Sequence, residues 1–314
     1  MKLVRWSVGM ATRAPDAVLA IGGFDGLHLG HQALIARAQA LARAHGLVAG
    51  VLSFEPLPRE FMTAAAPPPR VTSFRERFRI MDALGLDQFH VLRFTRALMA
   101  LGAERFVELL RRGGACHLVV GHDFRFGRQG AGTTDYLQPL AAANDMQVDV
   151  IPPVMVDGQR VGSSLVRRAL EAADFAAARR LLGRPYAMLG RVHRGAQLGR
   201  TLGFPTANLP VQRRKCALSG IFAVRVHTVG GRGATLAGAA GVASLGTRPQ
   251  VNGVESLLEV HVFDFDGDLY GRELGVEFVA RLRDEAKFAS LEAMTEQMHR
   301  DAADARRILE QTAA

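Results

Sequence analysis

The fold is decided by the stretch AVLAIGGFDGLHLGHQALIARAQALARAHG at residues 17–46. It begins with a short apolar run of the kind that a buried parallel strand shows, and it ends with the apolar spacing of a helix closed by Gly46. A glycine-rich turn joins the two, and such a turn presents backbone N–H groups to an anion at the start of the helix. The stretch therefore predicts an α/β domain with a phosphate-binding turn.

The same alternation of strand and helix continues to about Leu182. Short apolar runs, each typical of a buried parallel strand, recur at 47–54, 87–94, 116–121 and 147–152. Helical patterns lie between them at 73–85, 103–114 and 134–145. Alternation of this kind predicts a doubly wound α/β fold with a parallel sheet.

A different pattern begins after Pro185. Closely spaced strand patterns, separated by turns rich in Gly, Pro, Asn and Asp, lie at 187–195, 220–229, 237–246, 256–265 and 274–282. They predict a small antiparallel β-barrel, and the helical spacing after Ser290 predicts a terminal helix on its outside. Because a chain of 314 residues is long enough for two domains, we predict one domain at 1–183 and another at 184–314.

Composition narrows the class of partner. The chain has 39 basic and 30 acidic residues, and this surplus attracts anions such as nucleic acid, acidic lipid and nucleotide phosphates. The longest basic run is only Arg213–Lys215 and aromatic residues make up 7%, which argues against a nucleic-acid partner. Cys116 and Cys216 form no CxxC pattern, so neither a disulfide nor a zinc site is expected. Since no apolar stretch approaches the roughly 20 residues that cross a bilayer, we expect a cytoplasmic protein without a membrane partner.

The glycine-rich turn carries two histidines at the start of its helix. His28 and His31 bracket Gly30, and their ring N–H groups can neutralise charge on a triphosphate while the glycines let the backbone approach it. A bare HxxH is more often a pair of incidental histidines, but the full run GGFDGLHLGH (22–31) is far more specific. A zinc site is disfavoured because HLGH lacks the HExxH spacing, and a P-loop is excluded because the chain contains no GK[ST] motif.

The run GGFDGLHLGH resembles the HxGH signature of the nucleotidyltransferase superfamily, and its flanks are similar to the prokaryotic bifunctional FAD synthetase family. The chain departs from the family pattern at Gly162, where a serine is common, and at Leu57, where a histidine is common. The resemblance implies a Rossmann-like N-terminal domain that adenylylates FMN to FAD with release of pyrophosphate. Three further segments are similar to this family: SFEPLPREF (53–61), VVGHDFRFGRQGAG (119–132) and VGSSLVRRAL (161–170).

The resemblance also implies roles for individual residues of this domain. It implies that His28, His31 and Arg167 are catalytic. For Arg167 and the serines before it, taken alone, an ordinary helix start with a surface arginine is the competing interpretation. Contacts to ATP or flavin are implied for a larger set of turn residues, strand ends and serines, namely Gly23, Phe24, Asp25, Gly30, Phe54, Asp123, Ser163 and Ser164.

A second group of residues suited to phosphate chemistry lies in GRVHRGAQLGRTLGFPTANL at 190–209. Thr206 and Asn208 carry hard oxygens two residues apart, so in an extended chain they face one side and are able to hold Mg²⁺ and a phosphate together. The segment resembles the riboflavin kinase signature, and the resemblance implies that Thr206 and Asn208 serve Mg²⁺ and ATP. Three later segments are also similar to this kinase: 241–253, 257–274 and 282–301.

The resemblance further implies ligand contacts from Gly195 and Gly199 and a catalytic carboxylate at Glu259. Taken alone, Glu259 is an outward-facing glutamate on a strand. Phosphorylation of riboflavin, however, requires a neutral hydroxyl to lose its proton, whereas FMN already presents an anionic phosphate oxygen to ATP. The kinase site therefore needs a base such as Glu259, and the adenylylation site needs oriented donors and positive charge instead.

We therefore expect a bifunctional transferase that makes FMN from riboflavin in its C-terminal domain and FAD from FMN in its N-terminal domain. Its expected ligands are ATP, Mg²⁺, riboflavin, FMN and FAD, and its expected partners are small molecules; no oligomeric state is predicted. Two other functions are consistent with parts of the sequence. A different HxGH enzyme, which adenylylates a pantetheine or nicotinamide phosphate, would leave the PTAN segment (205–208) unexplained. A binder of nucleic acid or anionic surfaces would use only the net charge of +9.

Overall fold

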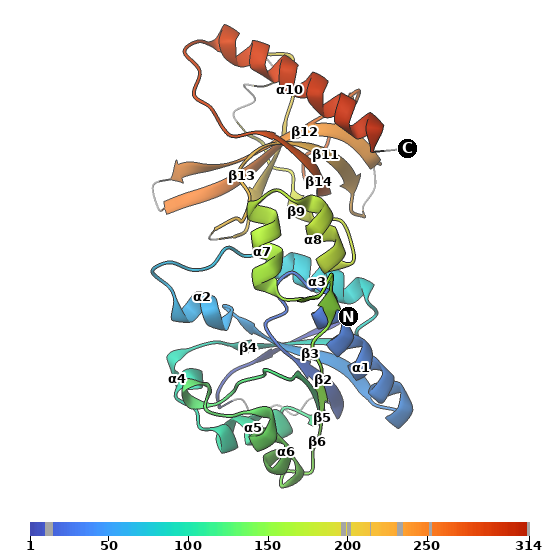
Figure 1. The fold of residues 1–314 in the computed structure, drawn as a ribbon, viewed down its shortest axis with the longest axis vertical. Helices are drawn as coiled ribbons and strands as arrows, with labels where there is room; N and C mark the ends of the chain where they lie inside the picture. Colours follow the sequence, from blue (N-terminus) through green and yellow to red (C-terminus); the bar gives the residue numbers. More distant parts are fainter. Residues whose placement is uncertain are drawn as a thin grey trace. The chain divides into compact units, whose positions relative to one another are not determined.

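A computed structural model describes residues 1–9, 15–195, 199, 202–213, 215–230, 235–250 and 253–312 of the chain (Figure 1). The chain divides into two compact units, each with its own sheet. The first unit is made of Met1–Pro68 and Arg77–Ser163, and the second of Pro69–Glu76 and Ser164–Ala314. The short segment 69–76 thus belongs with residues that follow it by more than eighty positions in the sequence.

The first unit contains a six-stranded sheet in which every neighbouring pair of strands is parallel, as the sequence predicts. Its order is β1-β4-β3-β2-β5-β6. The sequence pattern missed β1, an edge strand in which only Trp6 is buried. The strands are β1 (Lys2–Trp6), β2 (Ala17–Ile21), β3 (Val48–Glu55), β4 (Gln88–Arg93), β5 (Ala115–Gly121) and β6 (Gln147–Ile151).

Helices cover both faces of this sheet. Figure 1 shows α1 on one side of the sheet and α5 and α6 on the other. Leu19 and Leu52 of the sheet pack with Phe106, Leu110 and Leu137 of α5 and α6 in one core, where each fully buried side chain contributes about 1.5–3 kcal/mol. The helices are α1 (Leu29–His45), α2 (Pro58–Met62), α3 (Phe74–Ala83), α4 (Arg96–Met99), α5 (Ala103–Arg112) and α6 (Thr134–Ala142).

The order of the strands places a ligand site at one edge of the sheet. From β2 the chain proceeds to β3 and β4 on one side, and it then returns to β5 on the other side of β2. Strand order therefore reverses between β2 and β5. In open α/β sheets, ligands bind beyond the carboxyl ends of the strands at such a reversal. The loops that follow β2 and β5 are the segments at this position.

His90 of β4 is completely buried. Its ring lies edge-on to Trp6 with 5.3 Å between the ring centroids, and neither of its ring nitrogens has a hydrogen-bond partner among the described residues. Burial first, and the positive charge of Lys2 second, lower the pKa of His90 to about 4. The folded first unit therefore favours a neutral imidazole at this position.

This burial predicts a loss of stability in acid. Because the unfolded chain takes up the His90 proton near pH 6.5, the stabilisation by neutral His90 is complete above pH 6.5 and is lost as the pH falls to about 4. The difference corresponds to about 3 kcal/mol in the free energy of unfolding. Trp6, the single tryptophan of the chain, reports unfolding of this unit by fluorescence. His90→Phe is expected to flatten the pH dependence between 6.5 and 4; an unchanged slope would show that other groups cause it.

The second unit contains a six-stranded antiparallel sheet in the order β10-β13-β12-β11-β14-β9. An isolated bridge between His193, just after β9, and Asn208 of β10 joins the two edges, so the predicted barrel is confirmed. The sequence pattern missed β10, because its ANLPV contains an asparagine and a proline, which strands disfavour. The strands are β9 (Ala187–Arg191), β10 (Ala207–Val211), β11 (Gly220–Thr228), β12 (Ala237–Gln250), β13 (Gly253–Val262) and β14 (Glu273–Arg283).

The predicted terminal helix is α10 (Leu291–Gln311), which packs against β11, β12 and β14. Ser290 caps it by accepting a hydrogen bond from the Ala293 N–H. Bidentate pairs of Arg283 with Asp301 and of Arg306 with Asp264 attach the helix to the barrel. The remaining elements include the short 3-10 helix η1 (Arg128–Gly130), α7 (Ser163–Glu171), α8 (Phe175–Leu182) and a small hairpin of β7 (Met155–Val156) and β8 (Gln159–Arg160).

A buried ion pair ties the segment 69–76 to the barrel. The Arg213 guanidinium, which is 0% exposed, donates to the Glu76 carboxylate, which is 3% exposed, and to the Tyr186 hydroxyl. Glu76 also accepts hydrogen bonds from the Ser73 and Leu189 N–H groups. This charged pair is thus surrounded by hydrogen-bond partners within the second unit. Among the residues that the structure describes, none of the helices combines the length and apolar character needed to cross a membrane.

Candidate functional site

The first predicted site is a loop between β2 and α1. The backbone there adopts left-handed conformations at Phe24, Gly26 and Leu27, with φ of 52°, 84° and 43°. The helix begins at Leu29, and His28 caps it because its Nδ1 accepts the backbone N–H of His31 in the first turn. The positive end of the helix dipole lies at this point, as an anion site requires.

His28 and His31 lie against each other in this loop. Their rings stack with 3.7 Å between centroids and an interplanar angle of 18°, and the Phe24 ring lies 5.0 Å from that of His31. A Cβ at Gly30 would come within 3.2 Å of the His28 ring, so the glycine leaves room for the imidazole. The structure thus brings four predicted residues together at the helix start.

Burial favours the neutral form of the His31 imidazole in the free protein. Burial first, then the charges of His28 and Arg77, lower the pKa of His31 well below its ordinary value. Its buried Nδ1 has no hydrogen-bond partner among the described residues. A neutral imidazole still offers one N–H to a phosphate oxygen, and an arriving anion favours the protonated form.

Arg77 holds the loop in place, and sequence reasoning missed it. Its guanidinium is fully buried and donates to the Gly23 carbonyl at 3.1 Å, to the Ser53 hydroxyl at 2.9 Å and to the Glu55 carboxylate. The Ser53 hydroxyl donates to the same Gly23 carbonyl at 3.1 Å. In the sequence, Arg77 is one of several arginines in a helical pattern, and nothing marks it as buried.

The other end of the loop is fixed by Ser163. Its hydroxyl donates to the Asp25 carbonyl at 3.0 Å, and Asp25 itself is buried. Ser164 and Arg167, on the same helix, belong to the second unit, where the Arg167 Nε–H donates to the Pro69 carbonyl at 2.7 Å. Their predicted part in adenylylation remains a prediction.

Two more predicted residues lie at the carboxyl ends of the strands beside β2. Phe54 is close to the end of β3 and packs edge-on against Phe94 at 5.8 Å. Asp123 follows β5 by two residues and pairs with Arg160. Partial burial opposes ionisation of Asp123, but the hydrogen bond and charge of Arg160 outweigh it and lower its pKa. Phe54 and Asp123 therefore share the edge of the sheet that carries the histidines.

The two departures from the family pattern are accommodated differently. A Cβ at Gly162 would meet nothing within 4 Å, so this position has room for the side chain that the family commonly carries. Leu57 is buried at the start of α2, where it forms no side-chain cap. Neither residue takes part in the hydrogen bonds described above for the loop after β2.

The second predicted site is built on neighbouring strands of the barrel. Asn208 of β10 is directly opposite Glu259 of β13, and Glu259 is directly opposite Ser244 of β12. Opposite residues in antiparallel strands carry their side chains on one face. The Asn208 amide also donates to the Thr206 carbonyl at 3.3 Å. The barrel therefore joins the predicted Thr206, Asn208 and Glu259.

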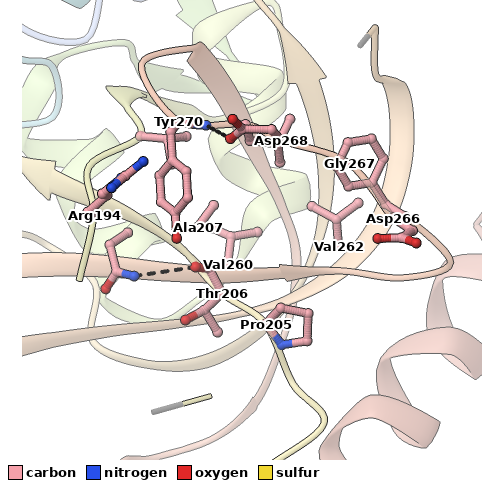
Figure 2. A pocket seen from close by; sticks show the side chains of 14 residues that line it. Arg194, Pro205, Thr206, Ala207, Val260, Val262, Asp266, Gly267, Asp268 and Tyr270 are labelled. Carbon is pink, nitrogen blue, oxygen red and sulfur yellow. Dashed lines mark hydrogen bonds between the residues drawn. The ribbon is translucent and has the colours of Figure 1, made fainter. Parts of the chain in front are cut away.

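Two cavities meet at Thr206 and Asn208, which line both. One has a volume of about 400 Å³; it contains Glu259 and His261 and is otherwise walled largely by apolar side chains, among them Leu202, Phe204, Ile221, Val242, Met294 and Met298. The other has a volume of about 590 Å³ and is more polar. Figure 2 shows its Tyr270 ring beside Arg194, whose guanidinium carbon lies 5.2 Å from the ring centroid, and it shows Asp266 and Asp268 on the same rim.

Both predicted glycines of this site lie against these polar groups. A Cβ at Gly195 would come within 2.7 Å of the Asn208 amide nitrogen, and one at Gly199 would come within 2.3 Å of the Phe204 carbonyl oxygen and 3.5 Å of the Thr206 hydroxyl. Only glycine fits such approaches. Some residues of the sequence analysis lie outside the described residues. They are 196–198 and 200–201 around Gly199, Arg214 of the basic run, and 251–252 of a kinase-like segment.

A second carboxylate lies in the apolar cavity. Partial burial first, and the charge of Glu259 second, raise the pKa of Glu285, while the charge of Arg283 opposes them. Arg283 is bound to Asp301. Within the described ranges, no group of three or more His, Cys, Asp and Glu side chains is placed to hold a metal ion.

Comparison with known proteins covers both sites. Residues 10–165 match a family model described as FAD synthetase, and 182–309 match one described as riboflavin kinase. The chain is 42% identical over 309 residues to the bifunctional riboflavin kinase/FMN adenylyltransferase of Pseudomonas fluorescens and 39% identical over 310 residues to that of Escherichia coli (strain K12). Each alignment covers 98% of this chain and 97% of the relative. A solved structure described as a macrolide-efflux protein from Streptococcus pneumoniae is similar with a TM-score of 0.76 and 28% identity, over 96% of this chain and 97% of that one.

Proposed function

The chain belongs to the family of bifunctional riboflavin kinase/FMN adenylyltransferases, and on this premise we propose how its two sites carry out the two reactions. Its C-terminal part is a riboflavin kinase and its N-terminal part an FAD synthetase, so that ATP, riboflavin, FMN and FAD are its substrates and products.

In the kinase reaction, Glu259 acts as the general base. It accepts the proton of the primary hydroxyl of riboflavin as the oxygen attacks the terminal phosphate of ATP. The observation that carries this assignment is the register of the barrel, because Asn208 and Glu259 are opposite each other on β10 and β13. The Glu259 carboxylate thus lines the smaller cavity beside Thr206 and Asn208, the side chains that we assign to the phosphates.

The two cavities suit the two substrates of the kinase. Leu202, Phe204 and Met298 give the smaller one the apolar walls that the flat ring system of riboflavin requires, with Glu259 at its polar side. The larger one offers Arg194 and Tyr270, which suit the charged and aromatic parts of ATP. The transferred phosphate would pass between them, beside the residues that line both cavities.

Thr206 and Asn208 are the residues that we assign to Mg²⁺ and the phosphates of ATP. Mg²⁺ prefers oxygen ligands and commonly takes only one or two from the protein, the rest coming from water and phosphate. The Thr206 hydroxyl and Asn208 amide offer such oxygens, and the absence of a side chain at Gly195 leaves space beside the amide. When bound, the cation neutralises charge on the transferred phosphate.

The adenylylation reaction needs no base, because the FMN phosphate is already anionic. We assign the phosphates of ATP to the start of α1, where His28, His31 and backbone N–H groups would donate to the oxygens that gain charge. Arg167 would add positive charge. Phe54 and Asp123, at the neighbouring strand ends, would contact the flavin or nucleotide, in line with the position of ligands in such sheets.

The boundary between the two activities is assigned to residue 183. The two family matches support it, since one ends at residue 165 and the other begins at 182. Glu76, however, is the buried partner of Arg213. A fragment that begins at residue 184 would therefore lack this carboxylate, and the full chain is the appropriate protein for experiments. The ATP requirement and the two free cysteines suit a cytoplasmic location.

His31→Ala tests the first site. We expect it to lower the rate of FAD formation from supplied FMN by about 10²–10³-fold, the usual effect of removing one preorganised donor. FMN formation from riboflavin should persist at the rate of the unchanged chain, because the second unit holds that site. Incubation of the full chain with riboflavin or FMN, ATP and Mg²⁺, followed by chromatography of the flavins, measures both. Equal loss of both activities in a folded variant would contradict two separate sites.

A further inference from the structure

The segment that leads into Thr206 lies beyond the β10–β13 ladder, and its Phe204 N–H donates instead to the Gly199 carbonyl at 2.8 Å. The β10–β13 ladder pairs Asn208 with Glu259 and Ala207 with Val260, and it ends there. Pro205 has no N–H to donate, so the ladder cannot continue past this point in the usual way. The residues just before β10 therefore need another partner if Thr206 is to hold a defined position.

His261 supplies that partner. Its Nδ1 lies 2.9 Å from the Pro205 carbonyl oxygen, and since a carbonyl only accepts, Nδ1 carries the proton and donates it. The same ring contacts Phe204 edge-on at 5.1 Å, and Phe204 contacts His299 of α10 at 4.8 Å. A side-chain hydrogen bond and ring packing thus take the place of the missing ladder.

The same strand carries the base and this clamp. Glu259 and His261 are two residues apart on β13, so their side chains lie on one face, and both line the smaller cavity. Thr206 directly follows Pro205, whose carbonyl His261 holds, and it lines both cavities. A misplacement of about 1 Å in such a group can cost about 10²-fold in rate.

We propose that His261 is a positioning residue of the kinase site: by donating from Nδ1 to the Pro205 carbonyl, it holds Thr206 and Asn208 in place for the phosphates of ATP while Glu259 faces the hydroxyl of riboflavin. This inference rests on the proposed function of the second unit. It assigns no contact with the reacting atoms to His261 itself. What matters is a donor at the δ position of this side chain.

Three variants of the full chain separate this role from a general structural one. His261→Phe keeps a ring but removes the donor. His261→Asn places an amide N–H close to the position of Nδ1, and His261→Gln carries the same amide one methylene farther out. We expect the kcat of FMN formation to fall about 10–100-fold in His261→Phe and His261→Gln, and to stay within about threefold of the unchanged chain in His261→Asn. The KM for MgATP should rise more than the KM for riboflavin, since Thr206 and Asn208 serve the phosphates.

FAD formation from supplied FMN serves as the internal reference, because it depends on the first unit. If His261→Phe does not fold, the comparison of the Asn and Gln variants still decides the question. A full kcat in His261→Phe, or equal losses in His261→Asn and His261→Gln, would overturn the proposal. The proposed function fails in a different way: the unchanged chain would then form no FMN, or Glu259→Gln would leave FMN formation intact, whatever the His261 variants do.

Discussion

Replacing Glu259 with glutamine is expected to lower the kcat of FMN formation by about 10²–10⁴-fold, the range over which general bases contribute. Glutamine has the size of glutamate, so the packing between β10, β12 and β13 should persist. It cannot accept the proton of the riboflavin hydroxyl. The KM for either substrate should change much less than kcat, because the lost interaction belongs to the transition state.

Two controls accompany Glu259→Gln. FAD formation from supplied FMN should be unchanged, since that reaction needs no base. Glu285→Gln removes a second carboxylate of the same cavity and should leave most of the kinase activity, because Glu285 has no position opposite Asn208. If both glutamine variants lost activity equally, the negative charge of the cavity, and not a specific base, would be the requirement.

Arg213→Met is expected to lower the free energy of unfolding of the second unit by about 3–5 kcal/mol, the cost of leaving a buried charge without its partner. The Glu76 carboxylate would remain inside the protein, where the backbone N–H groups of Ser73 and Leu189 would still donate to it. The expected loss is a large part of the stability of an ordinary domain.

Denaturant titration followed by far-UV circular dichroism and by loss of FMN formation measures this effect, while Trp6 fluorescence reports the first unit. Tyr186→Phe, which removes the hydrogen bonds of the hydroxyl with Arg213 and with the Val71 carbonyl but strands no charge, should cost less, about 1–2 kcal/mol. The double variant Arg213→Met/Glu76→Gln should recover part of the loss. A double variant whose loss equals the sum of the two single losses would contradict the coupling of the pair.

Much of the architecture could be predicted from local patterns. The strands near 17–23 and 116–121 are short apolar runs because both faces of a parallel strand are covered, and the structure has strands there. The terminal helix after Ser290 could also be predicted, since the capping serine and the helical spacing of apolar residues are features of adjacent sequence. Strand β10 was missed because its residues have weak strand propensity and are held by their neighbours in the barrel.

The candidate site residues could be predicted where a motif marked them. Their pKa values and the buried side chains that hold the surrounding segments in place could not. The motif marked His31 as a donor, but the burial that lowers its pKa was not visible in the sequence. Arg77 and Arg213 look in the sequence like any of the surface arginines, yet both side chains are completely buried. Their roles depend on partners that lie far away in the chain, and no local spacing reveals such partners.

The two fold classes could be predicted from the sequence alone, because hydrophobic periodicity and glycine turns are properties of neighbouring residues, and the candidate site residues were proposed from motifs that resemble known families. Only the tertiary structure decided that Glu259 is opposite Asn208, that Thr206 lies where two cavities meet, and that the segment 69–76 joins the barrel through Glu76. These are contacts between distant parts of the chain. Strand register, burial and the pKa values that follow from burial exist only once those parts have packed together.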